Sequence, residues 1–234
     1  MIDTWIAFAR GPLFRVALAV CLLGLVYRVG NTLWQIRSSH RQAGDKRLDT
    51  STVFKATVNG LLPFRLLKVR PLYTIASIGF HLGILLVPLF YIGHVTLWQA
   101  SLPLAWPTLG PAAGDALTLI GITGLVFVLL GRLLIRASRD LTAHEDVAIL
   151  IFLIFLMASG YWAAHATSSP FDPRAMLLTH LLLGNAALIL TPMTKIVHCV
   201  LGPLTQLLSE VAWHFPAESG RNVATVLGKE NEPI

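Results

Sequence analysis

The stretch THLLLGNAALILTPMTKIVHCVLG, residues 179–202, holds a single charged residue, Lys195, among leucines, isoleucines and valines. It exceeds the about 20 apolar residues that cross a bilayer as a helix. It also carries a histidine near each end, His180 and His198. An imidazole without a partner is costly in lipid, so both histidines are candidate functional residues.

The composition of the whole chain indicates an integral membrane protein. Of its 234 residues, 55% are hydrophobic and only 13% are charged, and the mean hydropathy is +0.68. The two cysteines form no CxxC or CxxCH motif, which argues against c-type haem and against a cysteine-bound metal cluster. The net charge of +6 comes from basic loops between apolar segments, and therefore indicates membrane topology rather than nucleic-acid binding.

Five apolar stretches are predicted to be transmembrane helices, because unpaired backbone groups are too costly in lipid for any simpler structure. They cover approximately residues 13–34, 73–98, 115–135, 147–162 and 175–200. We therefore expect an all-α fold with one five-helix domain, residues 1–202, and a polar cytoplasmic tail, residues 203–234.

The loops predict the orientation of the five helices. Residues 28–70 are rich in lysine and arginine, whereas residues 99–114 contain no basic residue. The positive-inside rule places the first loop in the cytoplasm and the second outside, with an external N-terminus. The expected location is the bacterial or archaeal cell (inner) membrane.

The spacing of four histidines predicts two haem sites. His180 and His198 are 18 residues apart, about five turns, which places both on one face of a continuous helix about 27 Å apart. The second predicted helix carries His81 and His94 and runs in the opposite direction. We expect His81 to face His198 near the cytoplasm and His94 to face His180 near the outside. Two facing imidazoles suit the axial positions of a b-type haem.

The spacing in the second helix fits one face less well. His81 and His94 are 13 residues apart, which rotates the second by about 220° on an ideal helix. Pro88 lies between them and is expected to kink the helix and change the phase. The alternative is that the haems approach this helix from different sides.

Haem propionates need nearby cations or polar groups. The predicted partners of the inner haem are six basic residues: Arg65, Lys68, Arg70, Arg132, Arg136 and Lys195. Arg174 is the predicted partner at the outer haem. Gly93, beside His94, would let the macrocycle approach the backbone, although small residues also serve ordinary packing of membrane helices.

Three segments carry a family resemblance. HLLLGNAALILTPMTKIVH (180–198), FHLGIL (80–85) and the Gly93-His94 pair are similar to the gamma, or cytochrome b, subunit of respiratory nitrate reductase. The resemblance implies a five-helix anchor with two haems b, whose axial ligands are His81, His94, His180 and His198. It also implies a quinone site beside the outer haem and electron transfer to a partner iron–sulfur subunit.

The sequence departs from that subunit in the loop before the second helix, which is longer here, and at the start of the third helix. There Gly114 and Asp115 stand where the family has a lysine associated with quinone. The long loop resembles relatives that accompany iron–sulfur proteins of the heterodisulfide-reductase type, hydrogenases or multihaem cytochromes c. Asp115 and His165 are our predicted acceptors of quinol protons.

Two other functions remain open on the sequence. The histidines of a haem-free channel or transporter could relay protons across the membrane, and such a protein would have discontinuous helices. A cofactor-free anchor could hold a soluble partner at the membrane, although it would not need four histidines at two depths.

Overall fold

The computed structural model describes residues 1–42, 50–102, 106–212, 224–228 and 230–231. The helices follow one another in the order α1 (Ile2–Arg10), α2 (Pro12–Gln42), α3 (Thr50–Leu61), α4 (Phe64–Val69), α5 (Pro71–Phe90), α6 (Ile92–Gln99), α7 (Pro111–Leu134), α8 (Arg136–Arg139), α9 (His144–Ala164), α10 (Pro173–Leu190), the 3₁₀ helix η1 (Lys195–Val197) and α11 (His198–Ala212). Within these ranges the sole β pairing is an isolated bridge between Tyr91 and Leu109.

The chain divides into two compact units. The first comprises Met1–Cys21 and Arg65–Ile196, and the second comprises Leu22–Phe64 and Val197–Ile234. The boundaries fall inside α2, after the first residue of α4 and just before His198. Three of the predicted haem ligands therefore belong to the first unit, and His198 belongs to the second.

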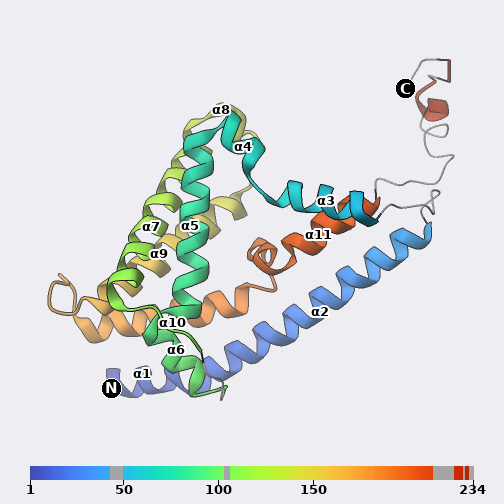
Figure 1. The fold of residues 1–234 in the computed structure, drawn as a ribbon. Coiled ribbons are helices and arrows are strands. Elements are labelled where there is room, and N and C mark those ends of the chain that lie inside the picture. The colour runs from blue at the N-terminus through green and yellow to red at the C-terminus, as the bar shows by residue number, and fades with distance from the viewer. Residues whose placement is uncertain (43–49, 103–105, 213–223, 229, 232–234) are drawn as a thin grey trace. The chain divides into compact units, whose positions relative to one another are not determined.

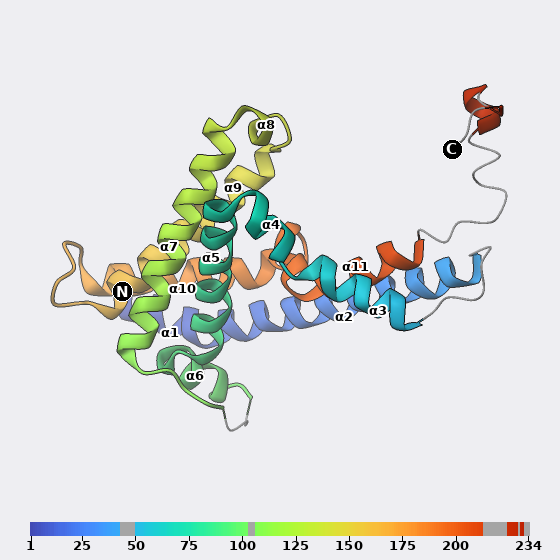
Figure 2. The same ribbon diagram turned by 45° about the horizontal axis from the view of Figure 1, so that its top comes forward.

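In the first unit, α7 packs between α5 and α9, while α10 packs against α9 and α1 (Figures 1 and 2). The buried core of this unit lies between α7 and α9, and side chains of α5 also pack against it. Its members are Leu125, Val128, Leu150, Leu153 and Met157. In the second unit, α3 lies along α11, where Gly60 faces the side chain of Gln206.

Five helical segments are long and apolar enough to cross a membrane. They are Ile2–Arg41, Pro71–Phe90, Pro111–Leu134, His144–Ala164 and Pro173–Leu190. Large apolar side chains such as Leu85, Phe127 and Phe155 remain exposed on them, as expected for surfaces that face lipid. The chain is thus a multi-pass, helical membrane protein, whereas its orientation stays a prediction.

The second predicted span is interrupted between its two histidines. Helix α5 ends at Phe90, Tyr91 is extended (φ −64°, ψ 132°), and α6 begins at Ile92. The expected interruption is therefore present, but three residues beyond Pro88. Two side chains satisfy carbonyls near it: Trp98 Nε1 donates to the Pro88 carbonyl at 2.8 Å, and the His94 ring contacts the Val87 carbonyl.

The last predicted span also differs from a continuous helix. Helix α10 ends at Leu190, and a turn and η1 separate it from α11, which begins at His198. Pro192 explains the ending, because proline has no N–H to donate to the carbonyl four residues earlier. The five-turn phase relation between His180 and His198 thus does not apply, although both residues remain predicted ligands.

Glycines bring α5 and α7 close together. A Cβ at Gly83 would lie 2.5 Å from the Leu117 carbonyl oxygen, and one at Gly124 would meet the Ala76 carbonyl oxygen. Gly79 faces Ile120 in the same interface. Backbone cannot yield as a flexible side chain does, so these glycines serve helix packing.

Replacing Gly124 with alanine should therefore destabilise the first unit. We expect a cost of about 1–3 kcal/mol, because the added methyl group forces α5 and α7 apart. Heating the detergent-solubilised protein and following the folded fraction by size-exclusion chromatography measures this loss. Gly30→Ala is the matched control, since its Cβ would meet nothing within 4 Å; equal melting of the two variants would contradict the packing role.

Candidate functional site

The structure brings His94 of α6 and His180 of α10 together. Their Nε2 atoms are 3.5 Å apart, and their ring centroids are 5.8 Å apart with 53° between the planes. The two residues are 86 positions apart in sequence. The predicted outer pair is thus formed within a single compact unit, and each ring presents the same nitrogen to the other.

Hydrogen bonds fix the opposite nitrogens of the two rings. His94 Nδ1 lies 3.1 Å from the Val87 carbonyl oxygen, and His180 Nδ1 lies 3.1 Å from that of Leu156. A carbonyl only accepts, so each Nδ1 carries the proton and each Nε2 presents a lone pair. Two lone pairs at this distance repel each other, and a proton or a metal ion between them removes the repulsion.

These contacts fit axial ligation of a haem iron. An imidazole nitrogen binds a first-row metal ion at about 2 Å, so two opposed ligands lie about 4 Å apart. The observed 3.5 Å requires only a small separation of the rings. Metal-binding histidines also donate their other N–H to a carbonyl or similar acceptor, as both rings do here.

Helix α9 shapes the position of the His180 ring. A Cβ at Gly160 would lie 2.7 Å from His180 Cε1, so only glycine leaves room for the imidazole there. Ser159 Oγ donates to the Leu156 carbonyl and lies 3.3 Å from His180 Nδ1. The ring is therefore oriented by α9 as well as by its own helix.

Asp115 and His165 also meet. Asp115 Oδ2 lies 3.2 Å from His165 Nε2, and the two side chains are 35% and 30% exposed. His165 Nδ1 donates to the Tyr161 carbonyl at 2.9 Å. With Nδ1 protonated, Nε2 and the carboxylate require one more proton between them. The two side chains thus form a partly accessible acid–base pair.

Two short connections link this proton site to the outer histidine pair. Asp115 follows Gly114, where a Cβ would lie 2.6 Å from the Tyr91 ring, and Tyr91 makes an edge contact with His94. On the other side, the His165 ring stacks on Tyr161 at 4.3 Å, which directly follows Gly160. The proton site and the histidine pair therefore belong to one region of the first unit.

The predicted inner ligands lie in different units. His81 of α5 directs Nδ1 to the Ser77 carbonyl at 2.7 Å and stacks on Phe80. His198 is the first residue of α11. The pairing of His81 with His198 stays a prediction.

The predicted inner cations occupy several environments. Lys195 Nζ and Arg132 Nη1 lie 2.7 Å and 3.7 Å from Asp146. Arg132 Nε is buried and has no hydrogen-bond partner among the described residues, so it could still receive an anion. Lys195 is exposed despite its contact with Asp146, as are Lys68, Arg70 and Arg136. Arg65 belongs to α4, and its side chain lies outside the described part of the structure.

At the outer site, Arg174 pairs with Asp3 at 3.0 Å, and both side chains are about two-thirds exposed at 66% and 68%. Gly93 faces the Tyr91 ring, where a Cβ would lie 3.0 Å from a ring carbon. The propionate role of Arg174 and the cofactor role of Gly93 stay predictions.

Several residues of this region were not predicted from the sequence. They are Tyr91, Ser159 and Gly160 around the histidine pair, and Arg10 and Arg15 in a pocket near α6. Their roles depend on which helices touch, and no local motif marks them. Within the described ranges no group of three or more His, Cys, Asp or Glu side chains could hold a metal ion, whereas axial ligation of a haem needs only two.

The chain is similar along most of its length to a known protein. No family model matches the chain. A protein of Nitratidesulfovibrio vulgaris (strain Hildenborough) is 32% identical over 208 residues, which cover 83% of this chain and 87% of that protein. Its name, "Protein", assigns it no activity. The two sequences align over most of their lengths, and this chain therefore belongs to the same family as the protein of N. vulgaris.

Proposed function

We propose that the protein is a di-haem b membrane subunit that transfers electrons between quinone and a partner subunit. The observation that carries the proposal is the outer histidine pair, with two Nε2 lone pairs 3.5 Å apart and both Nδ1 atoms held by carbonyls. A structural histidine in lipid would direct its polar atoms to donors or acceptors. Here two ligating atoms are directed at each other.

Each residue at the outer site has a separate proposed role. His94 and His180 would hold the haem iron, and the Val87 and Leu156 carbonyls fix their tautomers and ring orientations. Gly160 leaves room for the His180 ring. The haem, when bound, supplies reversible one-electron chemistry.

Asp115 and His165 are proposed to receive quinol protons. Oxidation of quinol to quinone releases two electrons and two protons. The Asp115–His165 pair lies at hydrogen-bond distance, is partly exposed, and adjoins the outer histidine pair. A quinol beside it would donate one proton to the Asp115–His165 pair and the other to solvent on the exposed side of the pair, while its two electrons leave one at a time through the outer site.

The second haem and the partner complete the proposed route. His81 and His198 would ligate the inner haem, with cations chosen from Arg65, Lys68, Arg70, Arg132, Arg136 and Lys195 near its propionates. The electron acceptor would be a cytoplasmic iron–sulfur subunit, for instance of the heterodisulfide-reductase type, or a multihaem cytochrome c. This arrangement is that of the gamma subunit of nitrate reductase, which the histidine segments resemble.

Haem content tests the proposal directly. The purified protein, expressed with haem supply, should contain two haems b per chain in a pyridine haemochrome assay. Its reduced spectrum should be that of low-spin, bis-histidine haem. A protein that is folded and monodisperse but binds no haem would overturn the proposal and favour the channel or the cofactor-free anchor.

A further inference from the structure

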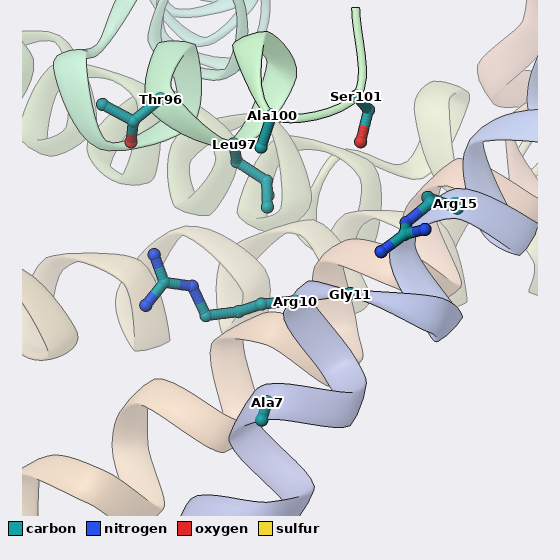
Figure 3. Close-up of a pocket in the computed structure, with 8 residues that line it drawn as sticks. All are labelled: Ala7, Arg10, Gly11, Arg15, Thr96, Leu97, Ala100 and Ser101. Atoms are coloured by element: carbon teal, nitrogen blue, oxygen red, sulfur yellow. The ribbon is translucent and has the colours of Figure 1, made fainter.

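A basic pocket lies between α1, the start of α2 and α6, within the first unit. Its volume is about 280 Å³, and its walls include Arg10, Arg15, Leu97 and Ser101. Figure 3 shows the two guanidinium groups below α6, with the Thr96 and Ser101 hydroxyls pointing toward them and Leu97 between. The pocket thus presents two separate cations on either side of an apolar side chain.

Neither arginine is paired. Within the described residues, no ion pair or hydrogen bond engages the guanidinium of Arg10 or Arg15. Arg174, the basic residue predicted at this end of the molecule, is already paired with Asp3. The two arginines are exposed, and together they form a cationic surface to which anionic groups of a ligand can bind.

The pocket adjoins the outer histidine pair through both of the helices that carry it. On α6, Leu97 follows His94 by three residues, which places both on one face of the helix. Toward α10, Asn185 is buried and its Nδ2 donates to the Ala9 carbonyl at 3.0 Å, next to Arg10. The rings of Phe14 and Trp98 pack at 5.3 Å and hold the start of α2 against α6.

From these contacts we infer that Arg10 and Arg15 bind the two propionate carboxylates of the outer haem. The inference rests on the proposed function, because it presupposes a haem between His94 and His180. Arginine suits this task, since its guanidinium group offers paired donors to a carboxylate and is always charged. On this inference the amino-terminal segment is part of the cofactor site.

The double variant Arg10→Gln, Arg15→Gln tests this inference through haem content and redox potential. We expect a lower midpoint potential for the haem that His180→Ala removes, because uncompensated carboxylates stabilise ferric iron. The other haem should keep its potential. Optical redox titration of the purified protein measures both, and Arg139→Gln is the control because it removes an exposed positive charge of α8.

The conservative variants Arg10→Lys and Arg15→Lys keep the charge and should retain most of the wild-type potential, even if the double glutamine variant fails to fold. Unchanged potentials in a double glutamine variant that retains both haems would overturn the inference. Unchanged potentials accompanied by a loss of co-purifying phospholipid phosphate would also overturn the inference, because the two arginines would then bind lipid. A wild-type protein without haem would instead refute the proposed function.

Discussion

His180→Ala is expected to lower the haem b content from two per chain to one. The substitution removes one of the two Nε2 atoms that face each other at 3.5 Å. The remaining His94 would hold at most a five-coordinate iron in a site that has lost the ring and its contacts with Leu156 and Ser159. The pyridine haemochrome assay, normalised to protein by amino-acid analysis, measures the change.

His94→Ala should have the same effect, because both variants empty the same site. His144→Ala is the matched control: this histidine is exposed at the start of α9 and should leave both haems in place. The double variant His94→Ala, His180→Ala should still retain one haem. Retention of two haems by either single variant would show that this pair does not bind iron, and loss of both by each would show that the sites are not independent.

The contact between His94 and His180 could be predicted from sequence because hydropathy marks both residues. A histidine inside an apolar segment is unusual enough to mark His94 and His180 individually, and helix direction pairs them by depth. The pairing did not require correct helix boundaries. Helix α10 ends at Leu190 and α6 starts at Ile92, yet the two rings meet within the first unit.

The residues around the ligands could not be predicted in the same way. Asp115 and His165 each lie near the end of a predicted span, which marks them individually. Their contact depends on how α7 packs against α9. The local sequence does not mark Arg10 and Arg15, because their pocket forms only where α1 and the start of α2 lie beside α6. Such roles arise from tertiary contacts between distant segments, whereas hydropathy reports only the local environment of each residue.

The second predicted span is interrupted at Tyr91, three residues beyond the kink predicted at Pro88. On an ideal helix, the spacing of His81 and His94 would place the second ring on the wrong side by about 220°. The break replaces that helical rotation with an extended residue, and α6 resumes in a new direction. Pro88 explains why the helix is weak here. The position of the break depends on Leu109, whose N–H donates to the Phe90 carbonyl.

Asp115→Asn is expected to slow quinol oxidation by about 10²- to 10⁴-fold, the range that general acid–base groups contribute. Asparagine keeps the size of the side chain but cannot accept a proton at physiological pH. The His165 ring would then lose the anion that lies 3.2 Å from its Nε2. The measurement is the rate at which a soluble quinol reduces the haems of the purified protein, followed by stopped-flow absorbance.

Haem content and potentials should remain at wild-type values in Asp115→Asn, because the carboxylate does not contact His94 or His180. Asp3→Asn is the control, since it removes an exposed carboxylate of the same end that pairs with Arg174 instead. A parallel loss of rate in His165→Gln, with no further loss in the double variant, would identify the two residues as one proton-accepting unit. Normal rates in Asp115→Asn would separate the proton acceptor from this pair while leaving the haem assignment intact, because the two conclusions rest on different contacts.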